Sequence, residues 1–348
     1  MKCAMLYGPG KLKIEEVEIP SIKKGEVLVE VRAALTCGTD IKTYIRGHPV
    51  LIRSYPSPFG HEFSGVISQV GTGVKRFTKG MKVVAANSAP CGQCYFCKKG
   101  YVNLCEDLRL LNGAYAQYIV IPERIVNKNL LEISDYVSFE DAALSEPIAC
   151  CLNAVCQSDI SLGDTVAIIG LGPIGLILTH LYHLNGAKVI ACGKGEKRLE
   201  LSKILGASLT VDAEEVHDET EEIKTVKKLS NNGRGADIVV EAVGKPDTWE
   251  MTVKMVRRGG LVILFGGCPS GTSFTMDTSL IHYEQITIKG IFHHTPKLFK
   301  RALDLISSGK INTKAIISGR LPLEKLEEAF SLVKKKKGVK YFIDAFYQ

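Results

Sequence analysis

The feature that most constrains the fold is a run of alternating strand-like and helix-like segments that starts near residue 163. Its first pair is TVAIIG (165–170), an apolar β-branched strand, followed by the helical segment PIGLILTHLYHLNG. The further strand-like segments cover residues 188–193, 208–213, 236–243, 259–267 and 286–292. Strands that alternate with helices form βαβ units, so this part of the chain is predicted to be an α/β domain with a doubly wound parallel sheet.

A glycine-rich motif joins the first of these strands to the first helix. Gly170, Gly172 and Gly175 form a G-x-G-x-x-G pattern that also contains Pro173 and Ile174. The pattern is weak by itself, but here it follows a buried-type strand and opens a helix. In that setting the glycines allow a tight turn and a close approach of a pyrophosphate to the helix N-terminus. The sequence therefore predicts a Rossmann dinucleotide-binding domain with these five residues at the cofactor.

The end of the second strand bears on which dinucleotide binds. An acidic residue there would accept hydrogen bonds from the adenine ribose and would repel a 2′-phosphate. Gly193 stands at that place, and Lys194, Lys197 and Arg198 follow it. The missing carboxylate and the added cations favour NADP(H) over NAD(H). Two alternatives remain open: the cations are solvated charges of a first helical turn, or Glu196 serves a ribose instead.

Four cysteines lie close together in one loop. Cys91, Cys94, Cys97 and Cys105 have the spacing C-x2-C-x2-C-x7-C. Four thiolates can surround one Zn²⁺ tetrahedrally, and such a closed shell leaves no position for a substrate, so the predicted zinc is structural. The alternative is a pair of disulfides, which is disfavoured because adjacent C-x-x-C pairs bridge poorly.

The length of 348 residues favours two domains. The first half is rich in strands and turns, and the tail returns to that style after the α/β series. We therefore expect a β-rich domain made of residues 1–154 and 293–348, with the nucleotide domain at 155–292 inserted into it. An active site is then expected in a cleft between two domains.

Composition excludes several classes of protein. The chain has 45% hydrophobic and 23% charged residues, with no apolar run long enough for a membrane span or a signal peptide. A net charge of +7 is modest, and its densest run, 334–337, has no interleaved aromatic residues, so nucleic-acid binding is not predicted. The 11 cysteines are interpreted as reduced thiols and metal ligands of a cytoplasmic protein. Six outside the metal sets are expected in the core: Cys3, Cys150, Cys151, Cys156, Cys192 and Cys268.

A second set of metal-ligand residue types is scattered through the first domain. It contains Cys37 in CGTD, His61 and Glu62 in GHEF, and Glu146 in SEPI. A zinc held by three side chains with one open position could bind an alcohol and lower its pKa. Spacing alone does not decide for a metal, because a lone histidine is as often a satisfied core residue and Cys37 could simply be buried.

The order of these motifs along the chain resembles that of a known family. CGTD, GHE, the four-cysteine loop, EP and GxGPxG follow one another as in the zinc-containing medium-chain dehydrogenase/reductase family, over nearly the whole chain and most like its sorbitol (polyol) and threonine dehydrogenase branch. The resemblance implies a GroES-like catalytic domain beside the Rossmann domain, one catalytic and one structural zinc, and a homotetramer or homodimer. It implies a hydride transfer between NADP(+) or NAD(+) and a secondary alcohol, polyol or amino alcohol, or the matching ketone in reverse.

The resemblance also assigns roles to single residues. Cys37, His61 and Glu62 would be ligands of the catalytic zinc. Glu146 stands where alcohol dehydrogenases carry a cysteine ligand, and would bind the metal directly, through water, or only in some states. Thr39 would take the proton of the alcohol.

The same resemblance bears on further positions. Lys42 replaces a histidine that serves the proton relay in many relatives, so the relay would use water, Lys42 or His48. Phe292 and His293 would shape the substrate pocket, the alternative being a polar hinge between domains. Lys340 matches a basic position that approaches the pyrophosphate, the alternative being a plain surface lysine.

Two other functions compete with a zinc dehydrogenase. A zinc-free quinone or enone reductase would share the nucleotide domain but lack the metal set. A sensor of NADP(H) or zinc would keep the glycine loop and the four cysteines while losing Thr39 or the catalytic ligands. Both rivals are disfavoured because Cys37, Thr39, His61 and Glu62 are all present.

Overall fold

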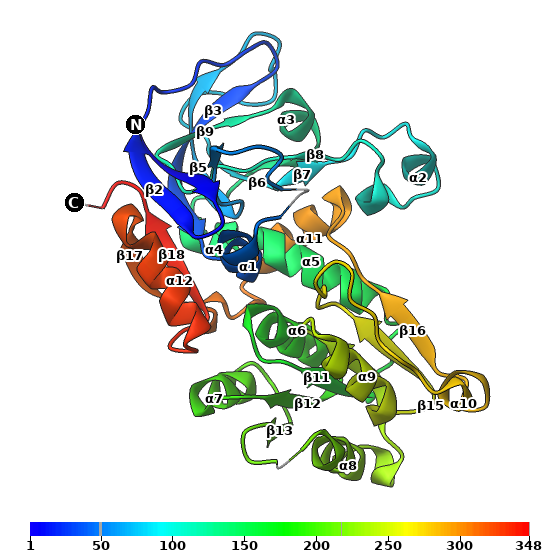
Figure 1. The fold of residues 1–348 in the computed structure, drawn as a ribbon. Helices are drawn as coiled ribbons and strands as arrows, with labels where there is room; N and C mark the ends of the chain where they lie inside the picture. Colours follow the sequence, from blue (N-terminus) through cyan, green and yellow to red (C-terminus); the bar gives the residue numbers. More distant parts are fainter. Residues whose placement is uncertain (49–50, 217, 348) are drawn as a thin grey trace. The chain divides into compact units, whose positions relative to one another are not determined.

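The computed structural model describes residues 1–48, 51–216 and 218–347, and they form two compact units. The first unit contains Met1–Ala149 and His294–Gln348, and the second contains Cys150–His293. Figure 1 shows the chain coloured from its N-terminus to its C-terminus.

The second unit is built on a six-stranded parallel sheet in the order β13-β12-β11-β14-β15-β16. This is the doubly wound order in which the chain starts at the middle of the sheet and reverses direction once. The predicted α/β series is thereby confirmed. The strands are β11 (Thr165–Ile169), β12 (Lys188–Gly193), β13 (Leu209–Asp212), β14 (Ala236–Glu241), β15 (Val256–Leu264) and β16 (Thr287–Gly290).

Helices connect these strands and cover the sheet. All five residues of β11 are buried, as expected for a strand covered on both faces. Helix α6 contacts α7, and α8 contacts α9, as expected where the helices cover the two faces of a doubly wound sheet in pairs. The helices are α6 (Pro173–Leu184), α7 (Glu196–Ile204), α8 (Glu219–Leu229), α9 (Pro246–Met255) and α10 (Thr278–His282), with a 3-10 turn at Asn231–Gly233.

The first unit contains a seven-stranded sheet in the order β10-β6-β5-β3-β18-β17, with β9 also paired to β3. Strand β18 pairs with β3 antiparallel although some 300 residues separate them in sequence, which ties the C-terminal segment to the N-terminal one. The strands are β3 (Val27–Leu35), β5 (Phe63–Val70), β6 (Lys82–Ala85), β9 (Tyr118–Ile121), β10 (Leu130–Glu132), β17 (Ile317–Pro322) and β18 (Lys340–Asp344).

Two small sheets complete the β structure described for this unit. One has the order β2-β1-β4, and the other pairs β7 with β8 at the base of the cysteine loop. The antiparallel pair of β1 and β2 in the first sheet was not among the predicted elements. The strands are β1 (Lys2–Gly8), β2 (Lys11–Glu16), β4 (Ser57–Pro58), β7 (Ser88–Ala89) and β8 (Arg109–Leu110).

The helices of the first unit are mostly short. The cysteine loop, expected to lack regular structure, contains the four-residue helix α2 (Tyr95–Lys98) and a 3-10 turn at Val102–Leu104. Helix α5 crosses the division between the units. The remaining elements are α1 (Gly38–Arg46), α3 (Glu123–Asn129), α4 (Phe139–Ala143), α5 (Ser145–Cys156), α11 (Pro296–Ser307) and α12 (Leu326–Lys334), with 3-10 turns at Thr313–Ala315 and Leu323–Lys325.

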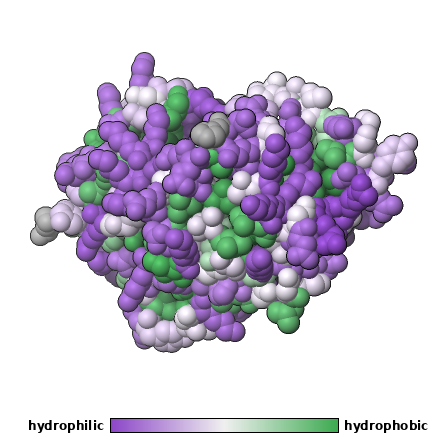
Figure 2. Space-filling view, turned by 90° about the horizontal axis from the view of Figure 1, so that it is seen from below, coloured by the Kyte–Doolittle hydropathy of each residue, from purple (hydrophilic) through white to green (hydrophobic). Residues whose placement is uncertain are grey.

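The helices, the surface and the cysteines agree only in part with the expectations from composition. None of the helices in the described residues is long and apolar enough to cross a membrane. Hydrophilic residues predominate on the face seen in Figure 2, with smaller hydrophobic areas among them. All 11 cysteines lie in the described residues, and none of them is in a disulfide. The expected burial is confirmed for Cys3, Cys151 and Cys192, whereas Cys150 and Cys268 are half-buried and Cys156 is exposed near the end of α5.

Candidate active site and metal centres

The structure brings together three of the four predicted catalytic metal ligands. Cys37, His61 and Glu62 each offer a ligand atom, and these atoms lie within 4.8 Å of one another. His61 and Glu62 are buried at 4% and 0% exposure, and Cys37 is half-buried. Burial and the nearby Glu62 carboxylate raise the pKa of the Cys37 thiol. A bound divalent cation would reverse this effect, because a thiol that coordinates a metal is deprotonated.

Local structure explains how these side chains meet. Strand β3 ends at Leu35, and Cys37 then caps the N-terminus of α1 by accepting a hydrogen bond from the backbone N–H of Thr39 at 3.4 Å. His61 and Glu62 directly precede β5, which pairs with β3 antiparallel. The end of one strand and the start of its neighbour are therefore adjacent.

Asp40 orients the imidazole of His61. Its Oδ1 lies 2.8 Å from His61 Nδ1, and its carboxylate is 1% exposed. Burial alone would lower the pKa of His61, but Asp40 and Cys37 outweigh it and raise that pKa well above its usual value. With Nδ1 engaged by a carboxylate, Nε2 is the nitrogen that can bind a metal, the common arrangement behind metal-binding histidines. Asp40 belongs to the CGTD motif, but nothing in the sequence alone indicates that it contacts His61.

Glu62 forms a buried ion pair with Lys340. The Nζ of Lys340 lies 2.8 and 2.6 Å from the two carboxylate oxygens and also donates to the carbonyl oxygen of Thr36 at 2.6 Å. Burial would lower the pKa of Lys340, but the Glu62 carboxylate raises it. A carboxylate has about four acceptor positions, so Glu62 retains capacity for a metal.

This placement argues against the cofactor-binding role that the sequence suggested for Lys340. Its side chain is 1% exposed, and its donors are directed to partners inside the first unit. The alternative of a plain surface lysine is also wrong. A lysine in this buried strand is stabilised by a carboxylate partner, because a buried charge requires one.

Glu146 lies outside the group of three. It is buried in the first turn of α5, where its Oε1 accepts a hydrogen bond from Asn87 Nδ2 at 3.1 Å. The Oδ1 of the same Asn87 lies 3.1 Å from His294 Nε2. Asn87 thus links Glu146 to His294, a connection that no pattern in the sequence indicates.

Thr39 and His48 bear on the proton path. Thr39 lies half-exposed in the first turn of α1, and Lys42 on the same helix is exposed. His48 Nδ1 accepts a hydrogen bond from the backbone N–H of Leu51 at 3.3 Å, and burial lowers the pKa of His48. A neutral ring whose Nδ1 already accepts carries its proton on Nε2, so it has no free acceptor.

The four cysteines of the loop converge as predicted for a structural metal. Ligand atoms of Cys91, Cys94, Cys97 and Cys105 lie within 4.8 Å of one another, and none of them is in a disulfide. The backbone N–H groups of Gln93 and Cys94 lower the pKa of Cys91 to about 6. A thiol with a lowered pKa, grouped with three others, suits Zn²⁺.

We expect Cys97→Ser to lose one zinc per chain and to loosen the loop, because metal binding replaces the core that this segment lacks. Trypsin should then cut faster at Lys98 and Lys99, which directly follow Cys97 in and after α2. Zinc analysis and timed digestion measure both effects, with Cys156→Ser as the control at an exposed thiol outside the loop. An unchanged zinc content would contradict the structural-metal assignment.

In the second unit the glycine motif has the geometry that a dinucleotide site needs. Gly170 has a φ of +100°, and Gly172 caps α6 with Pro173 at its first position. A Cβ on Gly175 would lie 1.8 Å from the Gly170 carbonyl oxygen, whereas a Cβ on Gly172 would meet nothing within 4 Å. The first and third glycines allow the turn and the close packing, and the second leaves open space at the helix N-terminus.

Gly193 ends β12 and is buried against the same loop. A Cβ at this position would lie 2.6 Å from Leu171 Cγ and 2.9 Å from Leu171 Cβ. Lys194 and Lys197 are exposed next to it, and Arg198 is half-buried. Packing therefore also explains why glycine stands at position 193: the Leu171 side chain occupies the space that a larger side chain would need.

Phe292 and His293 follow β16, as expected for residues at the carboxyl end of a strand. Phe292 is 58% exposed, and its ring centroid lies 5.6 Å from that of His293. His293 has a φ of +59°, and its carbonyl oxygen accepts a hydrogen bond from Asn153 Nδ2 at 2.8 Å. The substrate role predicted for this pair stays a prediction.

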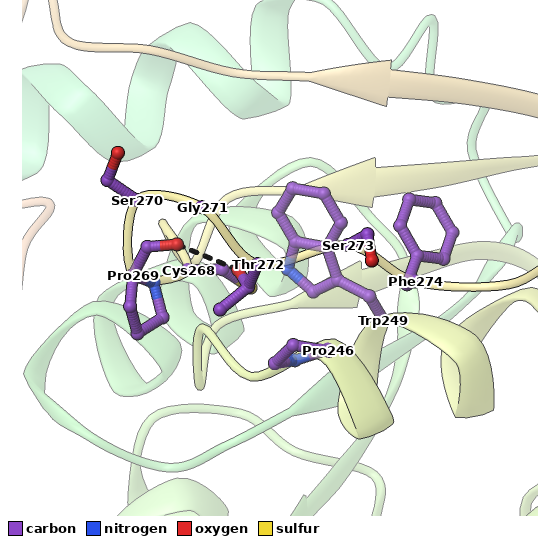
Figure 3. A pocket seen from close by; sticks show the side chains of 9 residues that line it. All are labelled: Pro246, Trp249, Cys268, Pro269, Ser270, Gly271, Thr272, Ser273 and Phe274. Carbon is purple, nitrogen blue, oxygen red and sulfur yellow. Dashed lines mark hydrogen bonds between the residues drawn. The ribbon is translucent and has the colours of Figure 1, made fainter.

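A hollow of about 270 Å³ lies where β14 and β15 lead into their following segments (Figure 3). Trp249 and Phe274 form its aromatic wall with ring centroids 5.3 Å apart, and Trp249 Nε1 donates to the Gly266 carbonyl oxygen at 3.0 Å. Its described lining includes no acid, no base and no member of the two cysteine-containing groups above. The two groups of candidate metal ligands described above therefore lie outside this hollow.

Comparison with known proteins agrees with this geometry. Residues 23–131 match the family of alcohol dehydrogenase GroES-like domains, and residues 173–308 match the family of zinc-binding dehydrogenases. Sorbitol dehydrogenase of Bacillus subtilis is 33% identical over 339 residues, which cover 94% of this chain and 92% of the relative. D-xylulose reductase A of Aspergillus oryzae is 31% identical, with 97% and 95% covered.

A solved structure is similar over the whole length. It is a protein of Sinorhizobium meliloti, described as a zinc-binding dehydrogenase bound to NADP, with 30% identity and a TM-score of 0.89, and the match covers 99% of this chain and 98% of that one. Both halves of the fold, the motif order and the extent of these matches agree. The chain therefore belongs to the zinc-containing medium-chain dehydrogenase/reductase family, among oxidoreductases that act on CH–OH groups, in the branch of the sorbitol dehydrogenases and xylulose reductases.

Proposed function

We propose that this protein oxidises a secondary alcohol of the polyol or amino-alcohol type, or reduces the matching ketone, with NADP(H) preferred over NAD(H). The observation that carries the proposal is the convergence of Cys37, His61 and Glu62 in one unit of a chain whose other unit has the dinucleotide-binding glycine loop. A thiolate, an imidazole and a carboxylate together fit a zinc ion that keeps one open position.

Each residue of the site has a task in this proposal. Cys37, His61 and Glu62 would hold the metal. Glu146 on α5 is a further carboxylate, and its Oε1 accepts a hydrogen bond from Asn87. When bound, zinc supplies a Lewis acid that lowers the pKa of an alcohol. Thr39 Oγ1 accepts the proton of the substrate hydroxyl. Because His48 has no free acceptor, Thr39 passes the proton to solvent along the exposed first turns of α1.

The nucleotide is held by the second unit. Gly170, Gly172 and Gly175, with Pro173 and Ile174, receive the pyrophosphate at the N-terminus of α6. When bound, the nicotinamide supplies the hydride acceptor or donor. Phe292 and His293 contribute to the substrate pocket. The two compact units then correspond to a catalytic and a nucleotide-binding domain, and a homodimer or homotetramer in the cytoplasm is part of the same proposal.

Turnover tests the proposal directly. The zinc-loaded protein should be screened with polyols, secondary alcohols and amino alcohols against NADP⁺ and NAD⁺, by the absorbance of the reduced nicotinamide. We expect turnover with at least one class and a higher kcat/KM with NADP⁺. Reduction of quinones or enones in the zinc-free protein would favour a reductase instead, and nucleotide binding without turnover of any class would favour a sensor.

The cofactor preference can be tested at Gly193, but not by one substitution alone. Asp at this position would press on Leu171, so Gly193→Asp by itself should weaken binding of both cofactors. In Leu171→Ala/Gly193→Asp the contact with Leu171 Cγ is removed and only the 2.9 Å contact with Cβ has to be relieved by a small shift. The carboxylate can then accept bonds from a ribose while it repels a 2′-phosphate. We expect the ratio of kcat/KM for NADP⁺ over NAD⁺ to fall about tenfold or more, since one repulsive contact of about 1.4 kcal/mol suffices for that factor.

Leu171→Ala is the matched control, because it opens the space without adding charge. It should leave the ratio of the two cofactors nearly unchanged. A double variant whose ratio equals that of this control would contradict the 2′-phosphate site at Gly193, Lys194, Lys197 and Arg198.

A further inference from the structure

A buried tyrosine lies behind the histidine of the proposed metal site. Tyr115 Oη lies 2.6 Å from Asp40 Oδ2, and Asp40 Oδ1 lies 2.8 Å from His61 Nδ1. The three side chains are 0%, 1% and 4% exposed. They form one continuous chain of hydrogen bonds from the core of the first unit to a proposed metal ligand.

The direction of the bonds follows from the chemistry of the groups. The phenol has one proton, and two acceptors are in reach: Asp40 Oδ2 at 2.6 Å and the Leu35 carbonyl oxygen at 3.0 Å. A charged acceptor forms the shorter and stronger bond, so the proton is directed to Asp40. Burial and the Asp40 carboxylate raise the pKa of Tyr115 well above its usual value, so the phenol remains a donor.

The ring of Tyr115 is fixed by its neighbours. Phe59 and Phe330 meet it edge to face, with centroids 5.8 and 6.1 Å away. Gly60, the first residue of GHEF, has a φ of +92°, and a Cβ there would lie 2.5 Å from the Tyr115 ring. The glycine that precedes the proposed ligands thus leaves room for this ring.

We propose that Tyr115 is a positioning residue for the metal site: its hydroxyl holds the Asp40 carboxylate in the orientation that keeps His61 Nε2 free for the metal. A phenylalanine ring would make the same aromatic contacts with Phe59 and Phe330. The hydroxyl of Tyr115 is therefore the group to which we assign the positioning role. Without the Tyr115 hydroxyl, Asp40 Oδ2 would lose this donor, and the buried carboxylate could rotate about its side-chain bond. The inference deepens the proposed function and depends on the metal assignment.

The test removes only the hydroxyl. In Tyr115→Phe we expect zinc at the Cys37 site to bind about 10- to 100-fold more weakly, the effect typical of lost outer-shell partners, while zinc in the cysteine loop is retained. Release of each zinc to a competing chelator measures this. After replacement of the zinc of this site by Co²⁺, the visible absorption of the bound ion should also shift, because its histidine ligand is less ordered.

Tyr118→Phe is the matched control. Tyr118 is a tyrosine of the same unit whose hydroxyl donates to a carboxylate, Glu30, at 3.2 Å, but that carboxylate is not attached to a proposed ligand. It should leave zinc affinity and the Co²⁺ spectrum unchanged. Wild-type zinc release and a wild-type spectrum in Tyr115→Phe would overturn the inference.

A second measurement separates positioning from general destabilisation. If Tyr115 acts through Asp40, Tyr115→Phe should weaken zinc little further in an Asp40→Asn background, whereas a purely structural effect would add to it. Additive losses therefore overturn the inference even where Tyr115→Phe is less stable. If Cys37→Ser keeps both zinc ions, the assignment of the metal site is wrong. If Cys37→Ser loses one zinc ion and Tyr115→Phe behaves as the wild type, the metal site stands and only the role of Tyr115 is wrong.

Discussion

Cys37→Ser should reduce turnover about a thousandfold or more while leaving nucleotide binding largely intact. A neutral serine hydroxyl replaces the one thiolate of the site, and the loss of a Lewis acid worth several kcal/mol corresponds to several powers of ten in rate. The zinc content should fall from about two ions per chain to about one, because only the structural site would remain. The chain has one tryptophan, Trp249 in α9 of the second unit. Nucleotide binding is therefore measured separately from the metal, by titration calorimetry together with Trp249 fluorescence.

Cys156→Ser is the control for this variant, because Cys156 is exposed and belongs to neither of the cysteine groups proposed to bind zinc. It should keep both zincs and full activity. Full turnover of Cys37→Ser with either NADP⁺ or NAD⁺ would contradict the assignment of Cys37 as a ligand of a catalytic metal. Loss of nucleotide binding together with turnover would instead mean that the substitution disturbs more than the first unit.

The parts of the fold that could be predicted are those governed by local rules. The parallel strands of the second unit are short apolar runs because both faces of such a sheet are covered, and β11 is buried at every residue. The glycine motif is equally local, since Gly170 and Gly175 lie five residues apart and one packs against the other. Cysteine spacing within one loop likewise indicates a shared metal without knowledge of the tertiary structure.

The parts that could not be predicted depend on residues that are distant in sequence. Lys340 follows Glu62 by 278 residues, and only the pairing of β18 with β3 brings them together. Leu171 and Gly193 are adjacent only because the loop after β11 lies against the end of β12. A signal for Lys340 was present: the closing strand GVKYFIDA is otherwise apolar, and a lysine in a buried strand needs a carboxylate.

Asp40 and Tyr115 illustrate a different limit. Asp40 was visible within CGTD, but nothing local distinguishes a carboxylate that caps a helix from one that orients a histidine 21 residues later. Tyr115 lies 75 residues from Asp40 in sequence, and only the fold directs its hydroxyl at that carboxylate. Metal ligands are recognisable from residue type and motif, while the residues that orient them become visible only in three dimensions.

Lys340→Met should destabilise the first unit by about 3–5 kcal/mol in the zinc-free protein, because it leaves the Glu62 carboxylate buried without its cation. The pair is 1% and 0% exposed at its side chains. Unfolding in urea, followed by circular dichroism, measures the loss. Zinc should offset part of it, since a metal bound by Glu62 supplies a new positive partner, and stabilisation by a ligand follows from its preference for the folded state.

Lys2→Met is the matched control, because Lys2 forms an ion pair with Glu324 at the same 2.6 Å separation but with side chains that are 44% and 47% exposed. Exposed pairs contribute about 0–1 kcal/mol, so this variant should unfold almost as the wild type does. Glu62→Gln added to Lys340→Met should recover part of the loss by removing the unpaired charge. If Lys340→Met is no less stable than Lys2→Met, the carboxylate is not buried as described. If zinc stabilises Lys340→Met no more than it stabilises the wild type, Glu62 does not serve as a metal ligand.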